Sequence, residues 1–173
     1  MFINPKTAIE KGWIKFPDWM TPEQQQKCIQ PNALDITADK IFLLDSFSEA
    51  MISEDGKVSR KIKPLDPVNG FWLLDHQQVF DVMSDFYVEI PEGVAAELTI
   101  RSTLNRAGLA LNSGIWDSGF KGNIGAIIHN RSGQCKLAPH TRMCQIKFIA
   151  SDSNSLYSGG YNTDKGQHWT EKK

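Results

Sequence analysis

Short apolar segments with a two-residue alternation recur along most of the chain and predict β-strands rather than long helices. Clusters of Gly, Pro, Asn and Ser separate the segments, as expected for turns between strands. No window approaches the roughly 18 apolar residues of a membrane-spanning helix. The pattern therefore predicts a mainly β domain. Its strongest strands are expected at residues 34–36, 41–44, 71–74, 86–90, 124–128 and 143–149, with one more ending at residue 100.

Two short helices are predicted before the first strand. An Asn-Pro pair in front and a Gly behind delimit a helix over residues 5–11, and a Thr-Pro-Glu sequence opens a second helix that ends near Cys28. Residues 45–70 carry charges of both signs and an Asp-Gly hairpin signal at Asp55. We interpret the helices as scaffold and residues 45–70 as a surface excursion.

Length and composition fit one globular domain, because 173 residues with 40% hydrophobic content can bury a core. A net charge of -1 argues against a nucleic-acid surface. The three cysteines form no C-x-x-C pair, which favours a reducing compartment, and the N-terminus lacks the order of a signal peptide. We therefore expect a soluble, cytoplasmic protein. Neither a P-loop nor a zinc-deaminase motif occurs in it.

One carboxylate stands out in the segment 111–130. Two turn clusters predict a hairpin there, and Asp117 lies between them, flanked by Trp116 and Phe120. A carboxylate between two aromatic residues near a strand end has the character of a general base. The alternative is a turn aspartate that caps its own backbone.

A second segment has the character of an anion site. Arg101, Ser102 and Thr103 open a predicted short helix that Gly108 ends, and Arg106 adds a second positive charge. Free N–H groups at a helix start favour an anion. The alternative is a capped surface helix with two solvated arginines.

The segment DSGFKGNIGAIIHN, which begins at Asp117, resembles the third signature segment of the trimeric dUTPases and is similar to the matching segment of the dCTP deaminases. The resemblance implies that Asp117 activates water. It also implies that the hairpin backbone, with Asn112, Gly114 and Trp116, faces the edge of a pyrimidine. Phe120 would lie against the deoxyribose, where a flat ring leaves no room for a 2′-hydroxyl.

Two further segments resemble family motifs that handle the triphosphate. QPNALD resembles the first motif, which implies that Asp35 helps to hold Mg²⁺, through water, on the substrate. Taken alone, an aspartate in such a turn is more often structural. RSTLNRAGL resembles the second motif, which implies that Arg101, Ser102, Thr103 and Arg106 contact phosphates.

The last two motifs lie near the C-terminus. An R-x-x-Q pattern resembles the fourth motif, which implies that Arg142 and Gln145 lie near the phosphates and the neighbouring subunit. The Gly-, Ser- and Asn-rich tail resembles the fifth motif, an arm that closes over the nucleotide. Tyr161 is the candidate ring over the base and Tyr157 the alternative. The arm lacks the arginine typical of dUTPases, and Lys165 is the candidate substitute.

The two families differ on the strand after Asp117. A dCTP deaminase carries a catalytic glutamate at the position of Ile127, and no Asp or Glu occurs anywhere from residue 118 to residue 151. Deamination of cytosine needs a proton shuttle, and this strand offers none. The sequence therefore favours hydrolysis over deamination.

Together the resemblances imply an all-β, jelly-roll-like (β-clip) barrel that forms a homotrimer with active sites at subunit interfaces. Residues 1–155 would form this domain and residues 156–173 the flexible arm. The expected activity is Mg²⁺-dependent hydrolysis of dUTP to dUMP and pyrophosphate, without nucleic-acid or membrane partners. The alternatives are a dCTP deaminase or bifunctional deaminase, and a nucleotide-binding or regulatory protein without turnover.

Overall fold

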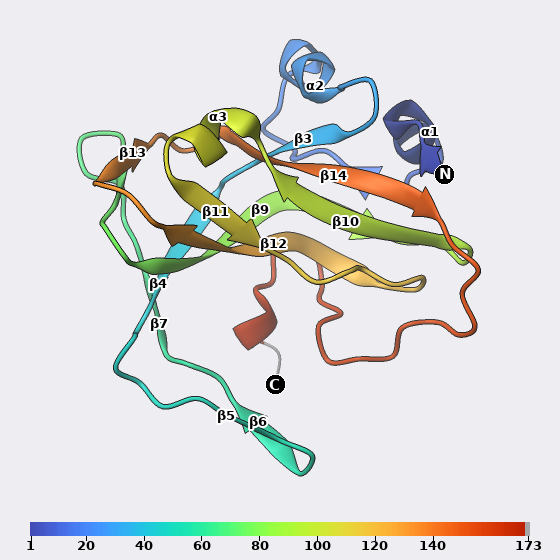
Figure 1. The fold of residues 1–173 in the computed structure, drawn as a ribbon. Helices are drawn as coiled ribbons and strands as arrows, with labels where there is room; N and C mark the ends of the chain where they lie inside the picture. The colour runs from blue at the N-terminus through green and yellow to red at the C-terminus, as the bar shows by residue number, and fades with distance from the viewer. Residues whose placement is uncertain (172–173) are drawn as a thin grey trace.

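The computed structural model describes residues 1–171, and two β-sheets account for most of its architecture (Figure 1). The first sheet is built around one strand, β14, which has a partner on each side. β10 pairs along one edge of β14, and β3 and β1 share its other edge. The bounds of these strands are β1 (Phe2–Ile3), β3 (Leu34–Thr37), β10 (Val94–Ile100) and β14 (Arg142–Ala150).

The second sheet has the order β11-β12-β9-β4-β7, and β2 pairs with the far end of β9. All of its pairings are antiparallel. Its strands are β2 (Ile14–Lys15), β4 (Lys40–Leu44), β7 (Ile62–Pro64), β9 (Val79–Glu89), β11 (Leu109–Asn112) and β12 (Lys121–Asn130). Two small ribbons complete the strands, namely β8 (Trp72–Leu74) with β13 (Cys135–Leu137), and β5 (Met51–Ser53) with β6 (Gly56–Val58).

The helices are short and begin where the capping residues predict. In α1 (Pro5–Glu10) the Asn4 side chain accepts a hydrogen bond from the backbone N–H of Lys6. In α2 (Pro22–Cys28) Thr21 and Gln24 form a reciprocal capping box. The remaining helical turns are α3 (Ser102–Arg106) and the 3₁₀ turn η1 (Trp169–Glu171). Among residues 1–171, no helix is long and apolar enough to cross a membrane.

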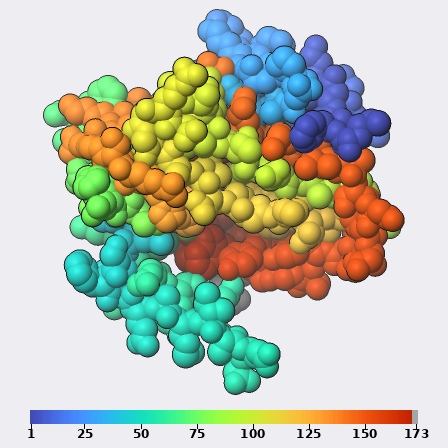
Figure 2. All heavy atoms as spheres, viewed as in Figure 1, coloured from blue at the N-terminus to red at the C-terminus, as the bar shows by residue number. Residues whose placement is uncertain are grey.

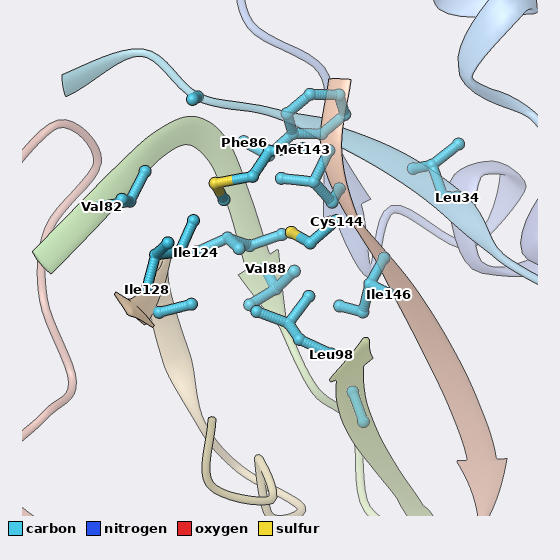
Figure 3. Packing of buried hydrophobic residues seen from close by; sticks show 14 of the residues in the cluster. Leu34, Val82, Phe86, Val88, Leu98, Ile124, Ile128, Met143, Cys144 and Ile146 are labelled. Atoms are coloured by element: carbon cyan, nitrogen blue, oxygen red, sulfur yellow. The ribbon is translucent and has the colours of Figure 1, made fainter. Parts of the chain in front are cut away.

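The hydrophobic core fills the space between the two sheets (Figure 3). Even-numbered residues of β9 and β12 are buried there, for example Val82 and Ile128, and they meet Leu98 and Ile146 from the first sheet. Each such side chain contributes roughly 1.5–3 kcal/mol when it is fully buried. The core confirms the all-β class with few short helices that the strand pattern predicted.

The odd-numbered residues of β9 and β12 point the other way, to the outer face of the second sheet. Asp81 of β9 lies directly opposite Ile127 of β12 in the register, so both side chains project from this outer face. Asp81 and Met83 are nevertheless buried. Something other than the first sheet must therefore cover β9 on this side.

The C-terminal tail provides that cover. After β14 the chain turns back beneath β11 and β12, and in the space-filling view the red tail lies against the yellow strands and beside the cyan hairpin β5–β6 (Figure 2). The backbone N–H of Tyr157 donates to the carbonyl of Ser118 at 2.7 Å, and that of Thr163 donates to Lys121 at 2.9 Å. The arm predicted over residues 156–173 ends with residues 172 and 173, which lie outside the described residues.

Three local predictions needed correction. The strand expected at 124–128 extends over the whole of β12, and the pieces expected around 86–90 form one continuous strand, β9. The register of the pair shifts between Asn123 and Gly125, and at this level the polar residues Ser84 and Asp85 interrupt the apolar run of β9 and hide its length. The excursion at 45–70 projects from the body as predicted, but its turn is Glu54–Asp55 rather than Asp55–Gly56.

Candidate functional site

A cavity of about 540 Å³ lies on the outer face of β9 and β12, between the loop 113–120 and the C-terminal tail. Its walls include apolar side chains and the backbone of the β11–β12 hairpin. Seven of the residues considered for the site from the sequence line it, namely Asn112, Gly114, Trp116, Asp117, Phe120, Tyr157 and Tyr161. The structure thus brings together the predicted general base, the predicted hairpin and both candidate tyrosines of the arm.

The loop 113–120 is fixed by one cross-strand contact and one ring stack. Trp116 and Ala96 exchange both backbone hydrogen bonds at 2.9 Å, which anchors the loop to β10. The ring of Trp116 stacks on that of Phe120, with centroids 5.7 Å apart and an interplanar angle of 10°. Gly119, with φ of 89°, turns the chain back toward β12. These constraints present Asp117 at the rim of the cavity.

Asp117 is exposed, and among residues 1–171 no hydrogen bond reaches its carboxylate. Only its backbone takes part in the turn, where its carbonyl accepts from the N–H of Phe120 at 3.1 Å. The alternative reading of Asp117, a side chain that caps its own backbone, is therefore wrong. The carboxylate is available to water and ligands at the mouth of the cavity.

Aromatic residues of the tail form the wall opposite the loop. Tyr157 packs against Phe120 with ring centroids 5.7 Å apart, and Tyr161 meets the edge of Trp169 at 5.6 Å. The ammonium of Lys57, from the protruding hairpin, lies 4.1 Å from the centre of the Tyr161 ring. Both tyrosines line the cavity, so the contacts leave open which of them would lie over a bound base.

The floor of the cavity contains a carboxylate that sequence reasoning missed. Asp81 accepts a hydrogen bond from Trp169 Nε1 at 3.1 Å, and His168 Nε2 lies 3.2 Å from the same oxygen, Oδ2. All three residues line the cavity. Two features of the sequence could have pointed to this contact. One is an acidic residue within an apolar strand, and the other is a His-Trp pair within the polar tail. Nothing in the local pattern linked positions 81 and 168.

The position of Asp81 bears on whether the cavity could support deamination as well as hydrolysis. The strand β12 has no acidic residue, as the sequence showed, but its neighbour β9 places Asp81 directly across from Ile127. Side chains directly opposite in an antiparallel pair lie about 5 Å apart at Cβ. The cavity therefore has a carboxylate next to Ile127. The absence of an acidic residue on β12 does not by itself exclude proton transfer to a bound base.

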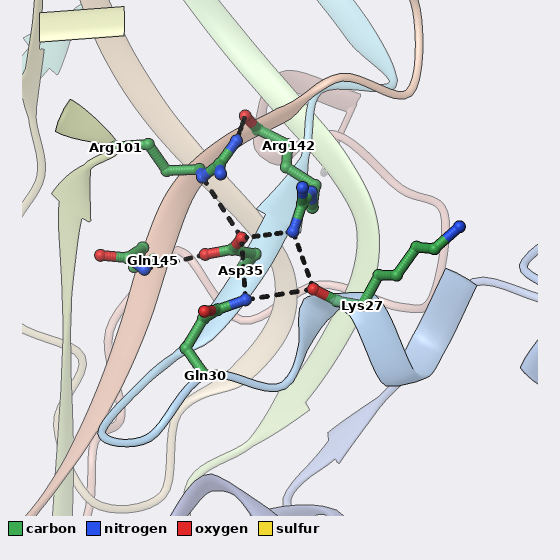
Figure 4. Close-up of polar contacts among 6 residues, drawn as sticks. All are labelled: Lys27, Gln30, Asp35, Arg101, Arg142 and Gln145. Carbon is green, nitrogen blue, oxygen red and sulfur yellow. Dashed lines mark hydrogen bonds and ion pairs between the residues drawn. The ribbon is translucent and has the colours of Figure 1, made fainter. Parts of the chain in front are cut away.

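Four other predicted site residues form a separate buried cluster around Asp35 (Figure 4). Arg101 Nε lies 3.2 Å and Arg142 Nη1 3.1 Å from Asp35 Oδ2, while Gln145 Nε2 donates to Oδ1 at 2.8 Å. Gln30 adds a longer contact of 3.4 Å to Oδ2. Only 1% of the Asp35 side chain is exposed. The cluster ties α2, β3 and the start of α3 to β14.

These contacts do not fit Asp35 as a ligand of Mg²⁺. Both of its oxygens already accept from side-chain N–H groups, and two positive guanidinium groups lie beside it. Mg²⁺ needs oxygen atoms that are free to face it or its water shell. Within residues 1–171 no group of three or more potential ligands could hold a metal ion.

The remaining predicted residues lie outside the cavity. Ser102, Thr103 and Arg106 are exposed on α3, and Lys165 forms an ion pair with Asp18, both oxygens of which lie 2.9 Å from its ammonium group. Within one chain, the residues expected to bind the base and sugar are thus separated from those expected to bind phosphates.

Burial sets the ionisation of the thiols. It raises the pKa of Cys28 to about 11 and that of Cys144 further still. Thiols with such values stay protonated near neutral pH and are poor nucleophiles. The described residues contain no disulfide, in line with the three free cysteines.

Comparison with known proteins places this geometry among nucleotide enzymes. A family model described as dCTP deaminase-like matches residues 7–151. A probable deoxyuridine 5′-triphosphate nucleotidohydrolase of Methanosarcina acetivorans is 27% identical over 140 residues, which cover 79% of this chain and 81% of the relative. Other relatives of similar identity are named dCTP deaminases.

Solved structures share the fold. The 2′-deoxycytidine 5′-triphosphate deaminase of Agrobacterium tumefaciens superposes with a TM-score of 0.65 at 15% identity over 87% of this chain, which spans about half of that protein (48%). A mutant dUTPase of the Staphylococcus aureus phage phi11, described with a structural Mg(II) ion, has a TM-score of 0.50 at 16% identity and covers 84% of this chain and 89% of its own. The expected jelly-roll-like architecture is confirmed by these similarities.

We predict that Asp35→Asn lowers the free energy of unfolding by about 2–4 kcal/mol, because the amide leaves two partly buried guanidinium groups without their anion. Asp117→Asn is the matched control, since its carboxylate has no partner among residues 1–171 and its loss should change stability by no more than about 0.5 kcal/mol. Urea unfolding followed by circular dichroism, at one protein concentration, measures both. Equal midpoints for the two variants would contradict the structural role of Asp35.

Proposed function

The chain belongs to the dCTP deaminase-like family, and we propose that within this family it hydrolyses dUTP to dUMP and pyrophosphate. The observation that carries the proposal is Asp117, an unpaired carboxylate at the mouth of a cavity with aromatic walls. The name of the Methanosarcina relative supports the same substrate.

In the proposed reaction Asp117 removes a proton from a water molecule as that water attacks the α-phosphorus. A new P–O bond forms, the bond from the α-phosphorus to the bridging oxygen breaks, and pyrophosphate leaves with the electron pair. A positioned carboxylate contributes on the order of 10²–10⁴-fold to such a step. The exposure of Asp117 at the rim, rather than at the floor, is consistent with a target on the phosphate chain and not on the base.

Selection of the sugar rests on the stacked pair Trp116 and Phe120. Phe120 is 7% exposed and wedged between Trp116 and Tyr157, so it cannot move aside for a larger ligand. A fixed ring beside C2′ of the sugar would clash with a 2′-hydroxyl. The hairpin backbone at Asn112 and Gly114 would face the base edge.

Phosphate binding requires groups from a neighbouring subunit. Ser102, Thr103 and Arg106 are exposed and do not line the cavity of their own chain. In a homotrimer, α3 of one protomer can face the cavity of the next, where Arg106 would neutralise charge on the phosphates. The contacts of Asp35 with Arg101, Arg142 and Gln145 would then hold α3 in position for this role. We infer Mg²⁺ as the cation of the triphosphate, and no residue of the chain is assigned to hold it.

Deamination of dCTP is the second candidate, favoured by the position of Asp81 across from Ile127. A carboxylate at the cavity floor is placed to exchange protons with a pyrimidine ring. The names of two relatives, a dUMP-forming dCTP deaminase and a dCTP deaminase, support the candidate. Ammonia release from dCTP distinguishes it from hydrolysis of dUTP.

We predict that Asp117→Asn reduces kcat for dUTP by about 10²–10⁴-fold, because the amide cannot accept the proton of the attacking water. Affinity for a non-hydrolysable dUTP analogue should change little, since the binding contacts remain. Asp152→Asn, another exposed aspartate outside the cavity, serves as the control and should retain normal turnover. Full activity of Asp117→Asn with normal binding would remove Asp117 from the mechanism.

We predict that two inactive variants restore each other when they share a trimer. Asp117→Asn and Arg106→Ala are each expected to be inactive as homomers. In equal co-expression about one site in four would combine an intact Asp117 with an intact Arg106 from a neighbour. Pyrophosphate release from the doubly tagged heteromers measures the rescue, and homomers mixed immediately before the assay are the control. Heteromers as inactive as their parents would contradict sites shared between subunits.

A further inference from the structure

Asp81 is an acidic side chain that is almost completely buried, with 6% of its surface exposed, yet it lines the cavity. Burial of a carboxylate is costly unless its oxygens find donors. Its oxygen Oδ2 has two nitrogen neighbours, from Trp169 and His168. Within residues 1–171 the other oxygen, Oδ1, accepts no hydrogen bond. The floor of the cavity therefore offers one unpaired anionic acceptor to a ligand.

The neighbours of Asp81 determine how it can act. Ile127 on β12 and Phe42 on β4 are its partners across the sheet and flank it with apolar surface. The ring of His168 packs on Phe42 at a centroid distance of 4.7 Å. The side chain is thus held in an apolar frame, where a hydrogen bond to an ionised group is stronger than in water.

The contacts of His168 hold its ring beside Asp81. Nδ1 of His168 faces Thr170: Oγ1 of Thr170 lies 2.6 Å from it, and the backbone N–H of Thr170 donates to it at 3.3 Å. Nε2 of His168 lies 3.2 Å from Asp81 Oδ2, and the indole N–H of Trp169 donates to the same oxygen at 3.1 Å. The hydrogen bond from Trp169 fixes the orientation of the carboxylate and leaves Oδ1 for the ligand.

We propose that Asp81 is a specificity-determining residue that accepts the N3–H of a uracil ring through Oδ1. The inference rests on the proposed function, because the uracil of dUTP has a single ring N–H, at N3, once N1 carries the sugar. Cytosine presents a lone pair at N3, which an anionic acceptor repels. Sites that hydrogen-bond a ligand N–H in this way discriminate strongly against an analogue without it.

Asp81→Asn tests the inference because the tail dictates how the amide must lie. The amide oxygen takes the place of Oδ2, where it accepts the indole N–H of Trp169 and stays beside Nε2 of His168. The amide NH₂ then faces the ligand, where it repels the N3–H of uracil and favours the N3 lone pair of cytosine. The variant should shift base preference toward cytosine rather than merely weaken binding.

The measurement is the dissociation constant of the imido analogues of dUTP and dCTP for the wild-type protein and for Asp81→Asn, by calorimetry. We expect the ratio of the two constants to move toward cytosine by at least about tenfold in the variant. Trp169→Phe is the control for a loosened tail. It removes a donor to Asp81 but keeps the carboxylate, so it should alter both constants without reversing their order.

An unchanged ratio in Asp81→Asn overturns the role of Asp81, even if both affinities fall. A wild-type preference for the dCTP analogue overturns it as well, since the carboxylate would then face the exocyclic amine. A wild-type protein that binds neither analogue refutes the proposed function itself and is distinguishable from both results.

If Asp81→Asn does not fold, binding of the N3-methyl analogue of dUTP to the wild-type protein is the alternative test. The wild-type protein should bind that analogue at least about tenfold more weakly than the dUTP analogue, and equal affinity overturns the inference.

Discussion

The antiparallel pairing of β9 with β12 is the constraint on which the rest of the structure depends. Because side chains alternate across a strand, this one pair builds both the core and the cavity. Its even positions meet the first sheet, and its odd positions form the floor on which the hairpin loop and the tail close. The register of β9 against β12 therefore determines both the core and the cavity. A shift by one residue would move Asp81 into the core and Val82 into the cavity.

The predicted site residues of one chain fall into two regions with different physical character, the cavity and the Asp35 cluster. Around the cavity, aromatic rings and one buried carboxylate meet in an apolar frame. Around Asp35, arginine and glutamine side chains bind both carboxylate oxygens, so few polar atoms remain for a ligand. The exposed residues of α3 lie with the second region. Assembly of subunits is the step that would unite the two regions, so the proposed activity requires a homotrimer.

Local signals in the sequence predicted much of this structure. Asn4 and Thr21 marked helix starts correctly, and the order of short motifs identified the family and placed Asp117 beside its aromatic neighbours. The contacts of Asp81 could not be predicted in the same way, because they join β9 to a tail residue 88 positions away. The length of β9 was also hidden, since the polar residues Ser84 and Asp85 interrupt its apolar run. Asp35 illustrates the opposite case: a motif suggested a metal, and the partners that occupy its oxygens became visible only in three dimensions.

The central claim is that this cavity serves hydrolysis of a pyrimidine deoxynucleoside triphosphate. The most direct measurement incubates the purified protein with Mg²⁺ and, separately, dUTP, dCTP, dTTP and UTP, and follows pyrophosphate and ammonia together. The account predicts pyrophosphate from dUTP, none from UTP, and no ammonia from any substrate. Ammonia from dCTP, or the absence of product from all four nucleotides, would contradict it.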